Sequence, residues 1–158
     1  MKKLLLIRHA KAEKETFGKD FDRPLKYTGI QDARFMADKL KEKAIIPQLI
    51  VSSPALRAKT TAEIFVDAFK LPDPTVKKSV YEAGRETWLK VINGLPDEFE
   101  TIAVVGHNPG IAEILRYLTG EGREVHTSTT ALVEFDIDSW AEISGNSGKL
   151  AFYSSPNE

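Results

Sequence analysis

Short apolar runs alternate along this chain with segments of helical periodicity, and no other feature limits the fold as strongly. A run that is apolar throughout, rather than at every second residue, is typical of a strand covered on both faces. Strands of that kind separated by helices favour a parallel sheet between two helical layers. The sequence therefore predicts an α/β fold, a three-layer α/β/α sandwich with a mostly parallel central sheet. The predicted strands are residues 4–7, 49–52, 101–105 and 131–135, with an edge strand at 149–154.

The segments between these runs carry apolar side chains three or four residues apart, as helices with one buried face do. Thr28-Gly29-Ile30-Gln31 fits a capping box at the start of the first helix. Ser53 and Asn108 are expected as N-caps, with Pro54 and Pro109 as the first helical residues after them. The predicted helices are residues 28–44, 54–69, 86–95 and 109–119.

The length and composition exclude several classes of protein. A chain of 158 residues is expected to form a single domain, residues 1–158. There is no cysteine, which excludes disulfides and thiolate nucleophiles and favours a cytoplasmic location. No apolar stretch approaches the roughly 18 residues of a membrane span. The formal net charge of −1 shows no basic excess for nucleic acid, so neither a membrane nor a nucleic acid is an expected partner.

Three of the predicted strands end next to residues suited to binding phosphate. Arg8 and His9 follow the first strand directly, Arg57 lies shortly after the second, and His107 follows the third. The carboxyl ends of parallel strands meet at one edge of a sheet, where α/β folds bind their ligands. We therefore expect these four side chains to share one pocket.

Arg57 is the clearest physical indication of a bound anion. It falls in the first turn of the second predicted helix, where the helix dipole disfavours a cation by roughly 0.3–1 kcal/mol. Two arginines, two histidines and the amino ends of helices together match a phosphate dianion. Catalysis of phosphoryl transfer depends mainly on such electrostatic stabilisation.

Each candidate residue can be given a role in phosphoryl transfer. His9 is the preferred nucleophile, because imidazole accepts a phosphoryl group and His9 adjoins Arg8 at a strand end. His107 would donate a hydrogen bond to the transferred oxygens. Glu82, after a further predicted strand, would protonate the leaving oxygen or activate the hydrolytic water.

Three motifs resemble those of the histidine phosphatase superfamily: Leu-Ile-Arg-His-Ala, Ser-Ser-Pro-Ala-Leu-Arg-Ala-Lys-Thr and Gly-His-Asn-Pro-Gly. Arg-Pro-Leu followed by Thr-Gly, together with the short chain, is most similar to the SixA-type phosphohistidine phosphatases. The resemblance extends over essentially the whole chain, in the same order. It implies a phosphoglycerate mutase-like fold and no metal or cofactor. It also implies a catalytic quartet with a phosphohistidine intermediate on the nucleophile, namely Arg8, His9, Arg57 and His107.

The resemblance implies further site residues and shows two departures. Arg23 would line the pocket and bind substrate, and Thr130 would lie near it. The superfamily's usual Arg-His-Gly is Arg-His-Ala here, a change that SixA-like members often show. The Tyr81-Glu82-Ala83 segment resembles the acid-bearing segment of the mutases only loosely.

Several functions are compatible with these residues. The leading hypothesis is a phosphohydrolase acting on a phosphorylated histidine-containing protein, because residues 71–81 leave little room for a lid over a small ligand. A phosphomonoesterase acting on a small phosphate ester is the first alternative. A non-catalytic module that binds phosphate or a phosphoprotein is the second, and an α/β interaction domain with an incidental anion site is the third. His126 is interpreted as a surface residue, and no His-x-x-x-His pattern favours zinc.

Overall fold

A computed structural model describes residues 1–14 and 18–156 of the chain. The described part forms a six-stranded sheet in the order β3-β2-β4-β1-β5-β6. Its strands are β1 (Lys2–Arg8), β2 (Leu49–Ser52), β3 (Thr75–Val76), β4 (Thr101–Gly106), β5 (Thr130–Phe135) and β6 (Gly148–Ser154). Its α-helices are α1 (Tyr27–Glu42), α2 (Leu56–Phe69), α3 (Arg85–Asn93) and α4 (Gly110–Thr119). Short 3-10 helices occur at η1 (Asp20–Asp22), η2 (Lys78–Val80) and η3 (Trp140–Glu142).

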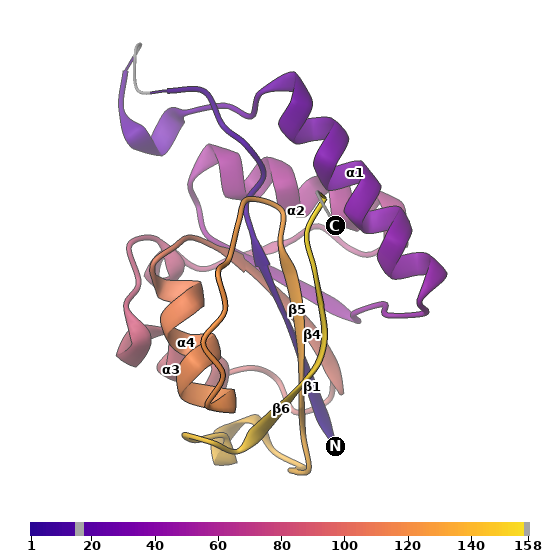
Figure 1. Cartoon of the computed structure of the whole chain (residues 1–158), viewed down its shortest axis with the longest axis vertical. Helices are drawn as coiled ribbons and strands as arrows, with labels where there is room; N and C mark the ends of the chain where they lie inside the picture. The colour runs from indigo at the N-terminus through magenta and orange to yellow at the C-terminus, as the bar shows by residue number, and fades with distance from the viewer. Residues whose placement is uncertain (15–17, 157–158) are drawn as a thin grey trace.

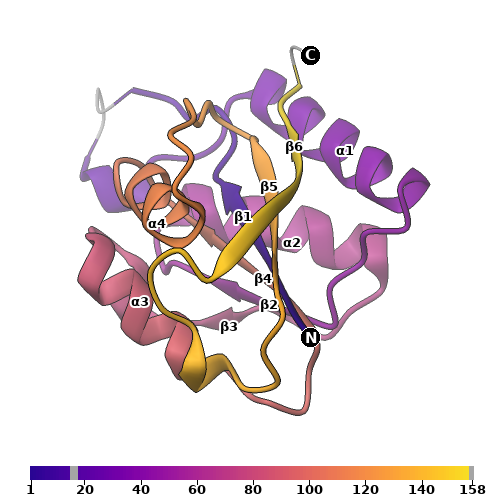
Figure 2. The ribbon, with the colours of Figure 1, turned by 60° about the horizontal axis from the view of Figure 1, so that its bottom comes forward.

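The sheet is mostly parallel, as predicted. β1 pairs with β4, β4 with β2 and β2 with β3, all in parallel, whereas β5 runs antiparallel to both β1 and β6. The predicted edge strand is β6, which lies beside β5 at one margin of the sheet (Figure 2).

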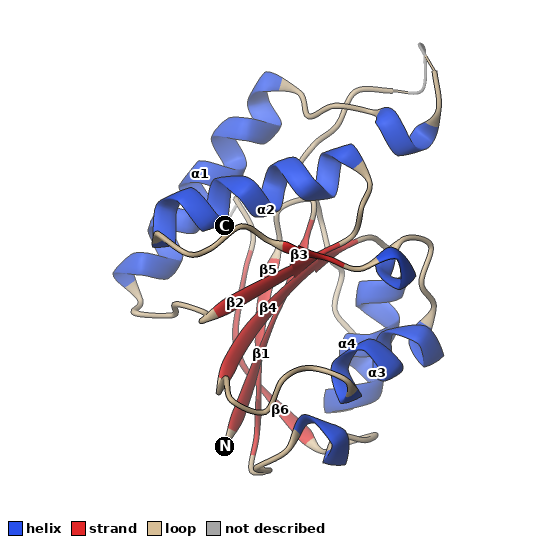
Figure 3. Ribbon diagram, turned by 180° about the vertical axis from the view of Figure 1, so that it is seen from behind, coloured by secondary structure: helices blue, strands red, loops and turns tan. Residues whose placement is uncertain are grey.

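Helices cover both faces of the sheet, which confirms the three-layer α/β/α arrangement. α1 and α2 pack on one face, and α3 and α4 pack on the other (Figures 1 and 3). In β1, Leu5 and Ile7 join the cluster under α1 and α2, while Leu4 and Leu6 join the cluster under α3 and α4. The apolar run of β1 is unbroken because both of its faces are buried. No helix in the described part of the chain is both long and apolar enough to cross a membrane.

The helix starts differ from the sequence-based expectation. α1 begins at Tyr27 with Lys26 at its N-cap and no side-chain cap, so the predicted capping box at Thr28 is wrong. The tertiary structure sets this start, because the Lys26 N–H donates to the Lys11 carbonyl at 2.9 Å. Gly29 then lies so close to Lys11 that an added Cβ would come within 2.2 Å of its carbonyl oxygen.

Helices α2 and α4, unlike α1, begin later than predicted. Ala55 is the N-cap of α2 instead of Ser53, and Pro109 is the N-cap of α4 instead of Asn108. Both predicted caps still accept a backbone hydrogen bond: Ser53 Oγ from Ala55 N at 3.2 Å, and Asn108 Oδ1 from Ala112 N at 3.3 Å. The predictions of Ser53 and Asn108 as N-caps, and of Pro54 and Pro109 as first helical residues, are therefore wrong, because the helical geometry begins after them.

Candidate active site

The carboxyl ends of β1, β4 and β2 lie next to one another in the sheet, and the four predicted side chains gather there. Arg8 is opposite Gly106 in the pairing of β1 with β4, which places His9 and His107 directly after neighbouring strands. Arg57 is the second residue of α2. All of them line one cavity of about 300 Å³. The remaining lining residues are Lys11, Ala12, Arg23, Lys26, Asn108 and Thr127.

This cavity, called the phosphate pocket below, is strongly basic. Five of its lining residues are lysine or arginine, namely Arg8, Lys11, Arg23, Lys26 and Arg57, and none of the described lining residues is acidic. Such a concentration of guanidinium and ammonium groups attracts anions and matches the oxygens of a phosphoryl group.

His9 is held as a neutral imidazole. Its Nδ1 lies 2.8 Å from the Ala10 carbonyl oxygen, which can only accept, so Nδ1 carries the proton. Its Nε2 is therefore unprotonated, and its electron pair accepts a hydrogen bond from Arg57 Nε at 3.3 Å. Burial, with a smaller contribution from the neighbouring charges of His107, Arg57 and Arg8, lowers the pKa of His9 to about 3. A neutral imidazole with an accessible electron pair is the form that attacks phosphorus.

Arg57 uses all three guanidinium nitrogens, and Asp20 is the partner that sequence reasoning missed. Besides its bond to His9, Arg57 donates from Nη1 to the Asp20 carbonyl at 2.7 Å and from Nη2 to Asp20 Oδ2 at 3.1 Å. The Tyr81 hydroxyl donates to Asp20 Oδ2 at 2.7 Å, and this bond is the main reason that the pKa of Tyr81 rises to about 12. Arg23 Nε donates to Asp20 Oδ1 at 3.0 Å. Asp20 thus links two arginines to the tyrosine that precedes Glu82.

The sequence signal for Asp20 was only indirect. A polar loop follows His9 directly, and loops in that position commonly carry site residues. The 3-10 helix η1 in that loop carries Asp20. The loop also contains Glu13, Glu15 and Asp22, and nothing in the local sequence pattern distinguishes among the four carboxylates.

His107 is buried beside His9, with 5.1 Å between the ring centroids. Its Nε2 is 2.7 Å from Ser53 Oγ. Burial, followed by the charge of Arg57, lowers the pKa of His107 to about 4. Its Nδ1 has no hydrogen-bond partner among the described residues.

Arg8 lines the phosphate pocket and is held by a backbone carbonyl. Its Nη1 donates to the Val125 carbonyl at 2.9 Å. Burial, together with the charge of Arg57, lowers its pKa from the usual 12.5.

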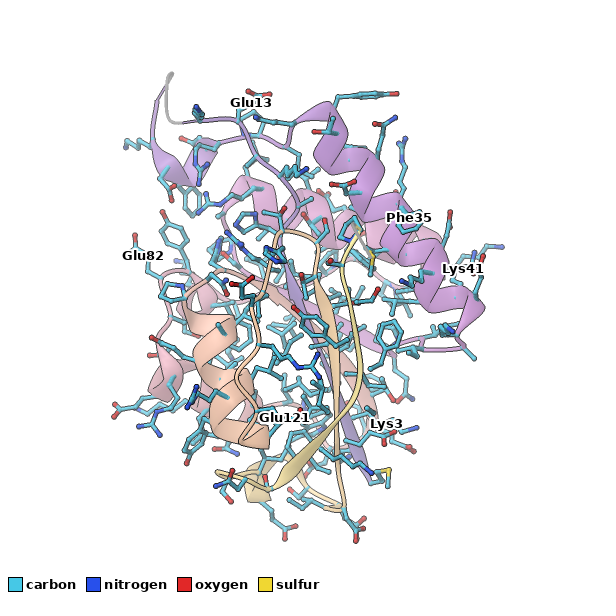
Figure 4. The ribbon with its side chains drawn as sticks, viewed as in Figure 1. Lys3, Glu13, Phe35, Lys41, Glu82 and Glu121 are labelled. Atoms are coloured by element: carbon cyan, nitrogen blue, oxygen red, sulfur yellow. The ribbon has the colours of Figure 1, made fainter. Side chains whose placement is uncertain are left out.

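Glu82 lies outside the phosphate pocket. It lines an adjoining cavity of about 450 Å³, which shares Arg57, His107 and Asn108 with the phosphate pocket. The side chain is exposed, and Figure 4 shows it at the edge of the molecule, on the side of the loop that follows β1. The strand expected before Glu82 is instead the 3-10 helix η2, and Glu82 itself has a positive φ of 57°.

The two expected substrate-binding residues differ in position. Arg23 lines the phosphate pocket, as described above. Thr130 is completely buried at the start of β5, opposite Ile7 in β1. Thr127, three residues earlier, reaches the pocket wall instead.

Within residues 1–14 and 18–156, no three side chains of His, Asp or Glu come together in a way that could hold a metal ion.

The two buried histidines predict a specific dependence of stability on pH. Their pKa values in the folded protein, about 3 and about 4, lie below the ordinary 6.5, so between these limits the unfolded chain binds protons that the folded protein does not. The free energy of unfolding should therefore fall as the pH falls from about 6.5 towards 4, with a slope of roughly 1 kcal/mol per pH unit for each histidine. Urea unfolding at several pH values measures this slope.

The control for this experiment is His126, which is exposed. His107→Gln should reduce the slope between pH 6.5 and 4, whereas His126→Gln should leave it unchanged. Equal slopes in the wild type and His107→Gln would contradict the assignment of a neutral, buried His107.

Comparisons with known proteins agree on one family. Residues 4–91 match the sequence model of the histidine phosphatase superfamily, branch 1. An uncharacterized chloroplastic protein of Arabidopsis thaliana is 32% identical, with the alignment covering 93% of this chain and 72% of that protein. The structure of the protein histidine phosphatase SixA complexed with tungstate has a TM-score of 0.85 at 25% identity, covering 98% of this chain and 97% of that one. A phosphohistidine phosphatase SixA candidate from Agrobacterium tumefaciens has a TM-score of 0.84 at 28% identity, covering 98% of both chains.

Proposed function

Because this chain belongs to the histidine phosphatase superfamily, we propose that it hydrolyses protein phosphohistidine through a covalent phosphohistidine intermediate on His9. Family membership and the likeness to SixA structures make it a phosphatase; the substrate and the intermediate are the proposal. The observation that carries it is the neutral His9, whose unprotonated Nε2 faces Arg57 in a basic cavity. The residues assigned to catalysis are His9, Arg8, Arg57 and His107.

In the first step, the phosphoryl group binds with its oxygens against the guanidinium groups of the phosphate pocket. His9 Nε2 gives its electron pair to phosphorus, and the bond from phosphorus to the leaving nitrogen or oxygen breaks. The leaving group keeps that bond's electron pair. Arg8 and Arg57 stabilise the negative charge that spreads over the phosphoryl oxygens in the transition state.

In the second step, a water molecule attacks the phosphorus of phosphorylated His9. The P–N bond breaks, its electron pair returns to Nε2, and inorganic phosphate leaves. The hydrogen bond from Nδ1 to the Ala10 carbonyl holds the ring in the same orientation and tautomer for both steps.

The position of Glu82 supports phosphohistidine as the substrate. A protonated imidazole is a good leaving group, so cleavage of a P–N bond needs little help from a general acid. An alkyl ester needs a proton delivered to its leaving oxygen, and Glu82 is exposed in the adjoining cavity rather than beside His9. The segment between α2 and α3 holds only the short elements β3 and η2. Two solved relatives with this fold carry the description of histidine or phosphohistidine phosphatase.

A comparison of substrates tests this function. The value of kcat/KM for a phosphorylated histidine-containing protein should exceed that for sugar phosphates and phosphoglycerates by about 10-fold or more. A clear preference for one metabolite would identify a small-molecule phosphomonoesterase that uses the same His9 chemistry. Binding of inorganic phosphate without turnover of any substrate would identify a non-catalytic binding module.

The role of Glu82 as a general acid has a separate test. If Glu82 protonates the leaving group, Glu82→Gln should lower kcat for an alkyl phosphate by about 10²-fold and for an activated phenyl phosphate much less, since phenolate leaves without a proton. Glu86→Gln, which changes an exposed carboxylate on α3, is the matched control. Equal losses on the two substrates would remove Glu82 from the acid role.

A further inference from the structure

His107 has two ring nitrogens in very different surroundings. Nε2 lies 2.7 Å from Ser53 Oγ, whereas Nδ1 is buried and has no partner in the described part of the chain. His107 is only 9% exposed and its pKa is well below the usual value, so the ring is neutral near pH 7. A neutral imidazole carries one proton, and which nitrogen carries it decides whether Nδ1 donates or accepts.

The hydrogen bonds of Ser53 decide between the two tautomers. Ser53 is completely buried, and its Oγ accepts the Ala55 N–H at 3.2 Å. Its own hydroxyl proton needs an acceptor, and His107 Nε2 is the acceptor that the described residues offer. If Nε2 were protonated instead, the Ser53 hydroxyl proton would be left buried and without an acceptor, which is unfavourable.

We propose that Ser53 is a positioning residue that holds His107 in the tautomer with the proton on Nδ1, so that His107 donates this N–H to a phosphoryl oxygen in the pocket. The Ser53 hydroxyl donates to Nε2, and the proton on Nδ1 is left for the ligand. The role towards a phosphoryl group rests on the proposed function; the tautomer does not.

This arrangement accounts for a buried donor, His107 Nδ1, that has no partner among the described residues. An unpaired N–H is unfavourable in a buried site, and a phosphoryl oxygen relieves that cost when it binds. His107 then complements the arginines of the phosphate pocket with a single directed hydrogen bond. The tight turn after β2, which places Ser53 beside His107, thereby contributes to the site as well as to the chain path.

The experiment measures the tautomer directly. Long-range ¹H–¹⁵N correlation spectra of imidazole rings distinguish a proton on Nδ1 from a proton on Nε2. In the wild type, we expect His107 to show the Nδ1–H pattern near pH 7, both without ligand and with inorganic phosphate. In Ser53→Ala, that pattern should be lost or mixed, and the Kd for inorganic phosphate should rise by about 3- to 10-fold, as expected for one neutral hydrogen bond.

Two further variants separate tautomer control from a general effect on folding. Ser52→Ala removes a neighbouring hydroxyl that is equally buried but donates to the Ser53 carbonyl at 2.9 Å, so it should leave the tautomer and the phosphate affinity unchanged. Ser53→Thr retains a hydroxyl and should retain the Nδ1–H pattern. Urea unfolding of each variant checks that the fold is intact.

Two results would overturn the inference: an Nε2–H pattern for His107 in the wild type, or a Ser53→Ala protein with an unchanged pattern and phosphate affinity. The wild-type spectrum decides even if Ser53→Ala does not fold. Neither readout requires turnover, so failure to hydrolyse phosphohistidine would overturn the proposed function without affecting this result.

Discussion

Replacing His9 with alanine should lower phosphatase activity by about 10⁴-fold or more and abolish the phosphorylated form of the enzyme. Among the described residues that line the phosphate pocket, His9 presents an unprotonated ring nitrogen, Nε2, next to Arg57. Without it, the arginines can still bind phosphate, but no group remains to receive the phosphoryl group. The measurement combines kcat on an activated phenyl phosphate with mass spectrometry of the protein after brief exposure to a labile phosphodonor.

His126→Ala is the matched control for this experiment. The side chain of His126 is exposed, with its Nε2 3.4 Å from Glu124 Oε2, and His126 does not line the phosphate pocket although it adjoins Thr127 in the chain. That variant should keep wild-type activity and become phosphorylated normally. A phosphorylated His9→Ala protein, or one that retains substantial activity, would show that another residue is the nucleophile.

Replacing Arg57 with lysine should lower kcat/KM by about 10²- to 10³-fold, the usual cost of losing a donor that stabilises transition-state charge. The guanidinium contacts His9 through Nε and Asp20 through both terminal nitrogens at the same time. The ammonium group of lysine keeps the charge but lacks this planar fork, so it cannot make all three contacts. Steady-state kinetics measure the loss, and Arg34→Lys on the exposed face of α1 is the control.

The variant Asp20→Asn measures how much of the loss of kcat/KM in Arg57→Lys comes from a changed orientation of the side chain at position 57. Alone, it should lower kcat/KM by about 10-fold, since the amide holds the guanidinium less strongly than a carboxylate does. Because the two residues are in direct contact, the double variant should be little worse than Arg57→Lys. Fully additive losses would mean that Asp20 acts independently of Arg57.

The position of the four proposed catalytic residues was predictable because it depends on local pattern. A fully apolar run indicates a strand buried on both faces, and the end of that run marks the edge of the sheet. Arg8 and His9 follow such a run directly, and His107 follows another after one glycine. Arg57 is the second residue of the helix that follows a third strand. Few other contacts are needed to bring these residues together once the strands pair in parallel.

Contacts between distant segments were not predictable in this way. Asp20 reaches Arg57 and Tyr81 only through the folded path of the loop after β1, and the four acidic residues of that loop are equivalent in sequence. Ser53 has a local reason to be at a turn, and nothing in the pattern shows that its hydroxyl meets His107, 54 residues away.

The sequence by itself therefore determined the layered α/β fold and the edge of the sheet where the basic and imidazole side chains gather. Those features follow from hydrophobic periodicity, which is a property of each segment alone. The tertiary structure decided where the helices begin, which carboxylate holds Arg57, that Glu82 lines the adjoining cavity rather than the phosphate pocket, and that Thr130 is buried. Each of these depends on hydrogen bonds and packing between segments far apart in the chain, whose free energies exist only after the sheet and its loops are assembled.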